Sequence, residues 1–130
     1  MTGEVREQVG GDPYAGWLGI ELLELEPGYC RAAMRLDPRM VNFHGDPHGG
    51  AIFSLADYAF SGACNVDGEP AVALSVTIQF LAAAMPGTRL VAEARVERQG
   101  RRAGFYRMTV TDETGGVIAS CQAVAFRRSS

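Results

Sequence analysis

The feature that most constrains this chain is a long run of apolar residues from Gly49 to about Cys64. On a helix of 3.6 residues per turn, the apolar side chains of this run occur on every side. They are Ala51, Ile52, Phe53, Leu55, Ala56, Tyr58, Ala59, Phe60 and Ala63. A helix that is apolar nearly all round is enclosed by other elements and does not lie on a surface. The run therefore predicts one long central helix that the rest of the chain wraps.

Segments on both sides of this run show the alternation that is typical of β-strands. Two strands are expected in residues 20–36, about a turn at Pro27-Gly28, and further strands over 89–98, 104–112 and 117–127. The clearest strand covers residues 72–80, where one face would carry Val72, Leu74, Val76, Ile78 and Phe80. Strands linked by turns in succession form an antiparallel sheet. The expected fold class is α+β, with a long central helix wrapped by a curved antiparallel sheet of about five or six strands.

The N-terminal segment is polar and contains glycine over residues 1–12, which is typical of a mobile end. Asp12 is suited to cap a short helix that has Pro13 in its first position. Trp17 and Leu18 would then dock this helix on the body of the protein. With no internal repeat and no linker, residues 1–130 are predicted to form a single domain.

Composition excludes several classes of function. The chain has a formal net charge of −3 and is 47% apolar, and an acidic balance without a basic stripe argues against a nucleic-acid partner. Cys30, Cys64 and Cys121 are odd in number and lie in apolar stretches, as expected of free buried thiols in a reducing compartment. No apolar run is long enough to cross a bilayer and no secretory leader is recognised. The sequence therefore favours a cytoplasmic protein without a membrane partner.

A narrow polar seam interrupts the apolar helix. Its members are three, four and four residues apart and would lie on one side: Ser54, Asp57, Ser61 and Asn65. The N–H groups of the first turn, which begins with Gly49 and Gly50, could polarise a carbonyl oxygen. Desolvation should raise the pKa of Asp57 and make it a better base near neutral pH. These are the parts needed to attack an acyl carbonyl, although Asp57 could also be a structural residue bonded to a neighbouring backbone group or serine.

The histidines before the helix suggest a metal site, but the spacing does not support one. His44, Asp46 and His48 offer two imidazoles and a carboxylate, yet Gly45 and Pro47 interrupt any helix that would align them. We therefore expect no metal, and we expect His48 to orient the loop or the substrate. A serine hydrolase is not expected, because no G-x-S-x-G motif occurs.

The stretch N-F-H-G-D-P-H-G-G at 42–50, L-A-D at 55–57, A-L-S-V-T-I-Q-F-L at 73–81 and A-V-A-F at 123–126 together resemble a known family. The chain is similar, over about residues 15–127, to the hotdog-fold acyl-CoA thioesterases, in the branch of the phenylacetate-degradation thioesterase. The resemblance implies the hotdog fold, a long helix wrapped by an antiparallel sheet. That is the architecture expected above from the residue pattern.

The resemblance also implies roles for individual residues. Asp57 would be the general base or the nucleophile, and the backbone N–H of Gly49 would polarise the thioester carbonyl. Asn42 would help to position water or substrate, with His48 beside the glycines. Ser61 falls where some relatives carry a hydroxyl that orients the carboxylate or the water. Substrate contacts are expected from Gly50, Phe53, Ser54, Tyr58, Ser75, Phe80, Arg101 and Arg102.

The same resemblance implies how the chains assemble. Family members form dimers whose sheets join edge to edge, often paired into tetramers, so Asp57 would face the Asn42–Gly49 segment of a neighbouring chain. Coenzyme A would lie along the interface as part of the substrate, and no separate cofactor is implied. Residues 80–87 lack the arginine that many relatives have there, so Arg101 and Arg102 are the candidates to hold the nucleotide phosphates.

The function expected from these features is hydrolysis of an acyl-CoA thioester to a free acid and CoA. The acyl group would be aromatic, such as phenylacetyl or hydroxyphenylacetyl, or of medium chain length. A non-catalytic acyl-CoA-binding hotdog module and a hotdog enoyl-CoA hydratase are the alternatives. The sequence does not decide among acyl groups.

Overall fold

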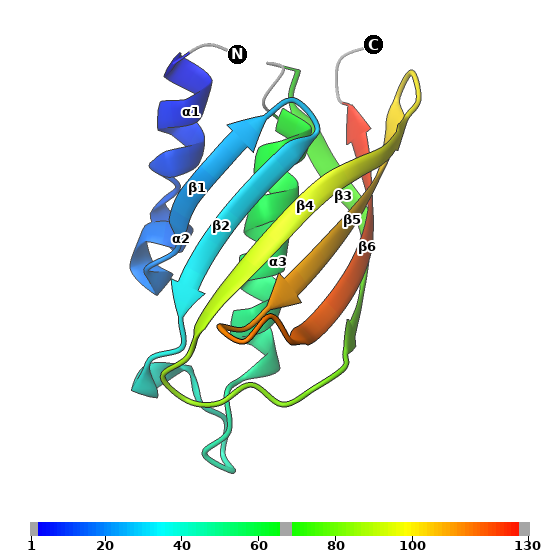
Figure 1. The fold of residues 1–130 in the computed structure, drawn as a ribbon. Coiled ribbons are helices and arrows are strands. Elements are labelled where there is room, and N and C mark those ends of the chain that lie inside the picture. The colour runs from blue at the N-terminus through cyan, green and yellow to red at the C-terminus, as the bar shows by residue number, and fades with distance from the viewer. Residues whose placement is uncertain (1–2, 66–68, 128–130) are drawn as a thin grey trace.

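A six-stranded sheet curves around one long helix in the computed structural model, which describes residues 3–65 and 69–127 (Figure 1). The helices are α1 (Gly3–Gly10), α2 (Pro13–Leu18) and α3 (Gly49–Asn65), with a 3-10 turn η1 (Pro38–Met40). The strands are β1 (Glu21–Glu26), β2 (Tyr29–Arg35), β3 (Ala71–Phe80), β4 (Arg89–Gln99), β5 (Ala103–Thr111) and β6 (Val117–Arg127). The predicted central helix and all six strand segments are confirmed.

The strands are antiparallel throughout, in the order β1-β2-β4-β5-β6-β3. The sequence predicted a sheet of successive turn-linked strands, and this holds for the pairs β1–β2, β4–β5 and β5–β6 but not for β2–β4 and β6–β3. The difference arises because α3 lies between β2 and β3 in the chain. At 1.5 Å per residue its 17 residues span about 25 Å, and the helix carries the chain across the sheet to the far edge, where β3 pairs with β6.

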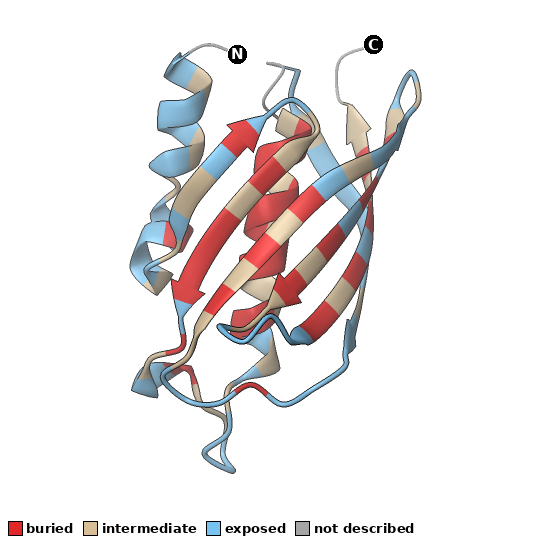
Figure 2. Ribbon diagram, in the orientation of Figure 1, coloured by how far each residue is buried: buried red, intermediate tan, exposed pale blue. Residues whose placement is uncertain are grey.

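The core lies between the inner face of the sheet and α3, as the buried residues in Figure 2 show. Leu55 and Phe60 of the helix are at most 1% exposed, and Phe60 contacts Tyr106 of β5 edge to face, with ring centroids 5.4 Å apart. The three cysteines are buried and none forms a disulfide. Within the described residues, no helix combines the length and the hydropathy needed to cross a membrane.

Strand β3 is less regular than its sequence predicts. Ala73 pairs with Ala125 and Ser75 with Val124, so Leu74 is an extra residue in a β-bulge. The bulge reverses which face the preceding residues occupy. Val76 and Ile78 pack against the core, whereas Val72 and Leu74 are 42% and 62% exposed. The single apolar face predicted for residues 72–80 is therefore wrong at its N-terminal end.

The N-terminal segment, predicted to be a mobile end, is helical over Gly3–Gly10. Val5 and Val9 of α1 pack against the core, and the hydroxyl of Tyr58 on α3 donates to the carbonyl oxygen of Val9 over 2.7 Å. Figure 1 shows α1 and α2 beside β1, at the edge of the sheet opposite β3. Buried apolar contacts and this hydrogen bond give the polar segment a fixed place.

Helix α2 begins as predicted and docks differently. Oδ1 of Asp12 accepts from the N–H of Ala15 over 3.0 Å, and Pro13 is the first helical residue. Leu18 packs against the core, but Trp17 is 67% exposed and does not dock the helix.

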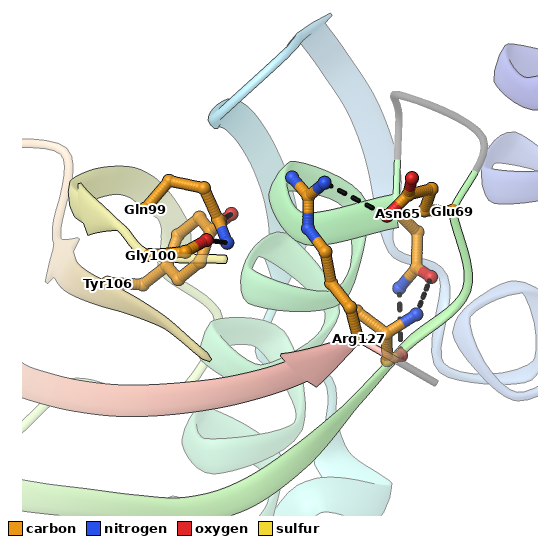
Figure 3. A network of polar contacts seen from close by, with 7 residues as sticks. Asn65, Glu69, Gln99, Gly100, Tyr106 and Arg127 are labelled. Atoms are coloured by element: carbon orange, nitrogen blue, oxygen red, sulfur yellow. Dashed lines mark hydrogen bonds and ion pairs between the residues drawn. The ribbon is translucent and has the colours of Figure 1, made fainter. Parts of the chain in front are cut away.

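The C-terminal end of α3 is fixed by the side chain of Asn65 (Figure 3). Its Nδ2 donates to the carbonyl oxygen of Ser61 over 2.9 Å, and its Oδ1 accepts from the N–H of Ala71 over 2.8 Å. Arg127 and Glu69 form an ion pair of 3.0 Å beside it. The last residue of the predicted polar seam thus joins the helix to the start of β3.

Candidate active site

The loop before α3 is organised by the side chain of Asn42. Its Oδ1 accepts from the backbone N–H groups of His44 and Asp46, at 2.9 and 3.1 Å, and its own N–H donates to the carbonyl oxygen of Asp46 over 2.8 Å. The amide oxygen therefore holds the loop. Nδ2 of Asn42 makes no hydrogen bond within the described part of the chain, so this nitrogen can donate to a ligand.

The start of α3 leaves one N–H group available. The N–H of Gly50 donates to Nδ1 of His48 over 2.8 Å, and the N–H of Ala51 donates to the carbonyl oxygen of His48 over 3.0 Å. The N–H of Gly49 has no partner among residues 3–65 and 69–127. A Cβ on Gly49 would lie 3.2 Å from Cζ of Phe80, so this backbone is closely approached. Helix dipole and free N–H together make this end of α3 suitable for a carbonyl oxygen.

Asp57 lies half-buried about the middle of α3, in a cavity of about 260 Å³. The N-terminal segment and α3 form this cavity together, with Asp12, Tyr14, Ala15, Ile20, Phe53, Ser54, Asp57, Tyr58 and Ser61 as its lining. Burial raises the pKa of Asp57, and the negative charge of Asp12 raises it further. Both effects favour a carboxylate that accepts a proton.

The structural interpretation of Asp57 is not supported. Its carboxylate makes no hydrogen bond or ion pair within the described part of the chain. Ser54 instead donates to the carbonyl oxygen of Gly50 and shares a hydrogen bond with the hydroxyl of Tyr14, both at 2.9 Å. Ser61 lines the same cavity, but it is not bonded to the carboxylate, so the orienting role expected of it lacks a contact in one chain.

One chain holds the two parts of the predicted site apart. Gly49 and Asp57 are eight positions apart in α3, and this spacing corresponds to about 12 Å along the helix axis. Asn42, His48, Gly49 and Gly50 do not line the Asp57 cavity. The structure therefore brings together Phe53, Ser54, Tyr58 and Ser61 around Asp57, and it gathers the remaining catalytic candidates at the N-terminal end of α3.

Three further predicted contacts lie outside both groups. Ser75 is exposed on β3, beside the bulge. Arg101 and Arg102 are exposed in the β4–β5 hairpin, which Figure 1 shows at the opposite end of the sheet from the 42–48 loop. Phe80 is nearer, because its ring contacts the backbone at Gly49.

Sequence reasoning missed the contribution of the N-terminal segment to the cavity. Asp12, Tyr14 and Ile20 line it, although Asp12 was identified as a helix cap alone. The pattern of residues 12–20 does carry a signal, since an acid and a tyrosine flank the proline that begins the helix. Nothing in one sequence indicates that this helix lies beside Asp57.

The two histidines have other partners than a metal. The ring of His44 packs on Phe43 with centroids 4.2 Å apart, and Nδ1 of His48 accepts from Gly50. No group of three or more potential ligands suited to a metal ion occurs among the described residues.

Comparison with known proteins places this geometry in a family. A model described as the thioesterase superfamily matches residues 44–119, more than half of the chain and including both Gly49 and Asp57. The chain belongs to the thioesterase superfamily. It is similar to the acyl-coenzyme A thioesterase PaaI of Escherichia coli K12, with 38% identity over 108 residues that cover 83% of this chain and 77% of that protein.

Solved structures of relatives share the fold. The E. coli PaaI protein from the phenylacetic acid degradation operon has a TM-score of 0.90 at 34% identity, covering 94% of this chain and 88% of that chain. A protein of Streptococcus mutans UA159, solved bound to acetyl-CoA, has a TM-score of 0.77 at 27% identity, covering 83% and 87%. The predicted resemblance and the hotdog α+β fold are confirmed, and this member of the thioesterase superfamily is an enzyme of the thioester hydrolase class.

Proposed function

We propose that this thioesterase hydrolyses acyl-CoA thioesters to a free acid and CoA, with Asp57 as general base or nucleophile. The observation that carries the proposal is the half-buried carboxylate of Asp57, which borders a cavity and has no partner among the described residues. An unpaired buried carboxylate costs stability, so a structural role does not account for it. The E. coli acyl-CoA thioesterase and the acetyl-CoA complex of the S. mutans protein support CoA esters as the substrate class.

The proposed reaction needs water and no further cofactor. The N–H of Gly49 donates to the thioester oxygen and stabilises the negative charge that develops on it. With Asp57 as base, the carboxylate takes a proton from water while the water oxygen bonds to the carbonyl carbon. The C–S bond then breaks, and the proton passes to the CoA sulfur. With Asp57 as nucleophile, its oxygen bonds to the same carbon, the C–S bond breaks and the CoA thiolate leaves. Water later hydrolyses the acyl anhydride to the free acid and the Asp57 carboxylate, and a proton released in this step converts the thiolate to the CoA thiol.

A second copy of the chain is proposed to complete the site, because Gly49 and Asp57 are too far apart on one helix to reach one carbonyl. The edge strand β3 supports this proposal, since its outer side pairs with no strand in the described chain. Exposed apolar residues accumulate on and after β3, namely Val72, Leu74, Phe80, Leu81 and Met85. Pairing of β3 with β3 of another copy would cover this edge and, as the family resemblance implies, bring segment 42–49 of one copy to Asp57 of the other.

The rest of the proposed complex follows the same resemblance. Dimers pair further into a tetramer, and the nucleotide of CoA lies along the interface with its phosphates near Arg101 and Arg102. The acyl group is aromatic, such as phenylacetyl, or of medium chain length. Light scattering distinguishes the dimer from the tetramer, and substitution of both arginines by glutamine should raise KM for the CoA ester more than it lowers kcat.

The decisive experiment compares the parental enzyme with Asp57→Asn on a panel of acyl-CoA esters. We expect the parent to release CoA and the variant to bind the ester without turnover. Parental turnover in the variant overturns the mechanism. Binding of CoA esters by the parent without hydrolysis would instead support the non-catalytic module, and hydration of an enoyl-CoA would support the hydratase. In a single turnover in ¹⁸O-labelled water, an unlabelled first acid would identify Asp57 as a nucleophile whose anhydride is hydrolysed at the Asp57 carboxyl carbon. Direct attack of water, or hydrolysis of the anhydride at the acyl carbon, labels the acid.

A further inference from the structure

A second pocket continues the Asp57 cavity along α3. It has a volume of about 520 Å³, and the two pockets share Asp12, Tyr58 and Ser61 as lining residues. Its far end reaches Asn65, eight residues beyond Asp57, which is about 12 Å along the helix axis. The two pockets are thus neighbours along α3, and the second lies on the side of Asp57 towards the C-terminal end of the helix.

Helix α1 forms the other wall of this second pocket. Glu4, Val5, Gln8 and Val9 all line it, and at helical spacing they fall on one side of α1. The helix is held against α3 by the hydrogen bond from the hydroxyl of Tyr58 to the carbonyl oxygen of Val9. Burial raises the pKa of Tyr58 to about 12, so this hydroxyl stays protonated and keeps donating at neutral pH.

The lining combines apolar and acidic groups. Val5, Val9 and the ring of Tyr58 offer apolar contact, and Glu4 and Asp12 offer carboxylates. No lysine or arginine occurs among the described residues that line the pocket. Hydroxyl and amide groups come from Ser61, Gln8 and Asn65. A chain with an uncharged end suits this pocket. An added negative charge would lie beside the carboxylates of Glu4 and Asp12, whereas Arg6, whose charge acts on Tyr58, does not line the pocket.

We infer that the pocket between α1 and α3 receives the distal part of the acyl group, and that α1 thereby selects uncharged acyl groups of medium length. This inference rests on the proposed function, since it adds a binding site for the substrate of the Asp57 centre. The acyl carbonyl lies at Asp57, and the chain passes Tyr58 and Ser61 towards Asn65. A hydroxyl at the end of the chain is accepted by the acidic lining, and a terminal carboxylate is rejected.

The first test uses three CoA esters of equal length and different chain ends: decanoyl-CoA, ω-hydroxydecanoyl-CoA and the ω-carboxyl analogue. The best of acetyl-, butyryl- and phenylacetyl-CoA serves as the short reference. We expect kcat/KM for the hydroxyl ester to equal or exceed that for decanoyl-CoA. The ω-carboxyl ester should be poorer by about tenfold or more, since its charge lies beside the carboxylates of Glu4 and Asp12. Equal values for the methyl and carboxylate ends overturn the inference.

The second test fills the pocket from α1. Val5→Trp and, at a more exposed position of the same wall, Gln8→Trp should each lower the ratio of kcat/KM for decanoyl-CoA to that for the short reference by roughly tenfold, as overpacking of a binding cavity does. Glu7→Trp is the matched control, because it adds the same ring to α1 and Glu7 does not line the pocket. Gln8→Trp keeps the test valid where Val5→Trp impairs folding.

The outcomes separate this inference from the proposed function. A fall of the ratio in the Val5 or Gln8 variant, with the parental ratio in Glu7→Trp, supports the acyl pocket. An unchanged ratio in a folded Gln8→Trp variant that still hydrolyses the short ester overturns the pocket and leaves the thioesterase mechanism standing. Absence of hydrolysis of every ester by the parental protein overturns the proposed function itself, and the acyl pocket with it.

Discussion

Gly50 donates its backbone N–H to Nδ1 of His48 over 2.8 Å, at the first turn of α3. Ala51 and Ile52 donate to the carbonyl oxygen of the same histidine. His48 therefore caps the helix with both its ring and its backbone, and Gly49 keeps a first-turn N–H that has no partner among the described residues. An oxyanion site requires a backbone N–H group that is not already hydrogen-bonded, and the N–H of Gly49 at the start of α3 meets this requirement.

Removal of this N–H should abolish most of the turnover. Proline suits the first position of a helix and lacks the donor, so Gly49→Pro removes the N–H and retains α3. We expect kcat to fall by about 10²–10³-fold, as for other deletions of an oxyanion donor. Gly49→Ala is the control, because its Cβ meets the ring of Phe80 in the same way while the N–H remains. Equal kcat values for the two variants would exclude this N–H from the mechanism.

Asp57→Asn should separate catalysis from stability. We expect kcat to fall by about 10²–10⁴-fold, the usual contribution of a positioned acid or base. The pKa of Asp57 is raised in the folded protein, so the folded state binds this proton more tightly than the unfolded state. The carboxylate therefore destabilises the fold at neutral pH, and the penalty disappears as the pH falls below the ordinary carboxyl pKa. Urea unfolding at pH 7 should show the variant at least as stable as the parent, and a large loss of stability would indicate a structural carboxylate.

Asp12 should tune the pH dependence of the enzyme. Its charge is one of the two causes that raise the pKa of Asp57. Asn is as good a helix cap as Asp, so Asp12→Asn removes the charge and keeps the contact with the N–H of Ala15. The acidic limb of the kcat/KM profile should move to lower pH in this variant. A limb that stays in place would mean that Asp12 does not act on Asp57 in the working enzyme.

Two inactive variants should restore each other's activity if the site spans two copies. A mixed dimer of Asp57→Asn and Gly49→Pro chains has one site with both defects and one site with neither. Random pairing at a two-fold interface then gives about a quarter of the parental activity. The measurement is turnover after the two proteins are unfolded and refolded together in equal amounts. Activity no greater than that of the separate proteins would place both groups in one chain.

Asn65→Ala should loosen the end of α3 without touching the chemistry. Its amide joins the carbonyl oxygen of Ser61 to the N–H of Ala71 (Figure 3). Loss of these contacts leaves part-buried backbone groups unpaired, which costs about 1–3 kcal/mol. Chemical denaturation should show this decrease in the free energy of unfolding. An unchanged free energy of unfolding would show that water replaces the amide.

Much of this fold could be predicted because local signals agreed. The all-round apolar character of residues 49–64 identified α3, and the alternation within residues 104–112 identified β5, on which Tyr106, Met108 and Val110 are buried. The bulge at Leu74 could not be predicted, because a bulge depends on the partner strand and leaves the alternating pattern intact. The docking of α1 was missed for a similar reason, since Val5 and Val9 gain their contacts from distant residues.

The candidate site was predictable to a lesser degree. The helical spacing of the seam identified Asp57, and the glycine pair identified the donor end of the helix. The hydrogen bond from the N–H of Gly50 to Nδ1 of His48 was not predicted, because residues two positions apart in a loop can adopt many relative conformations. The wall formed by Asp12, Tyr14 and Ile20 requires knowledge of how α2 lies on α3, which is a tertiary arrangement and not a local one.

The open edge of β3 has a consequence for how the specific activity of the enzyme depends on its concentration. Because each proposed site draws on two copies, the specific activity depends on protein concentration through the dissociation constant of the pair. Below that constant, twofold dilution should lower the rate more than twofold, and substrate should shift the pair towards assembly by mass action. Such an enzyme has little specific activity at concentrations well below the dissociation constant. Its specific activity then rises over a narrow range of protein concentration.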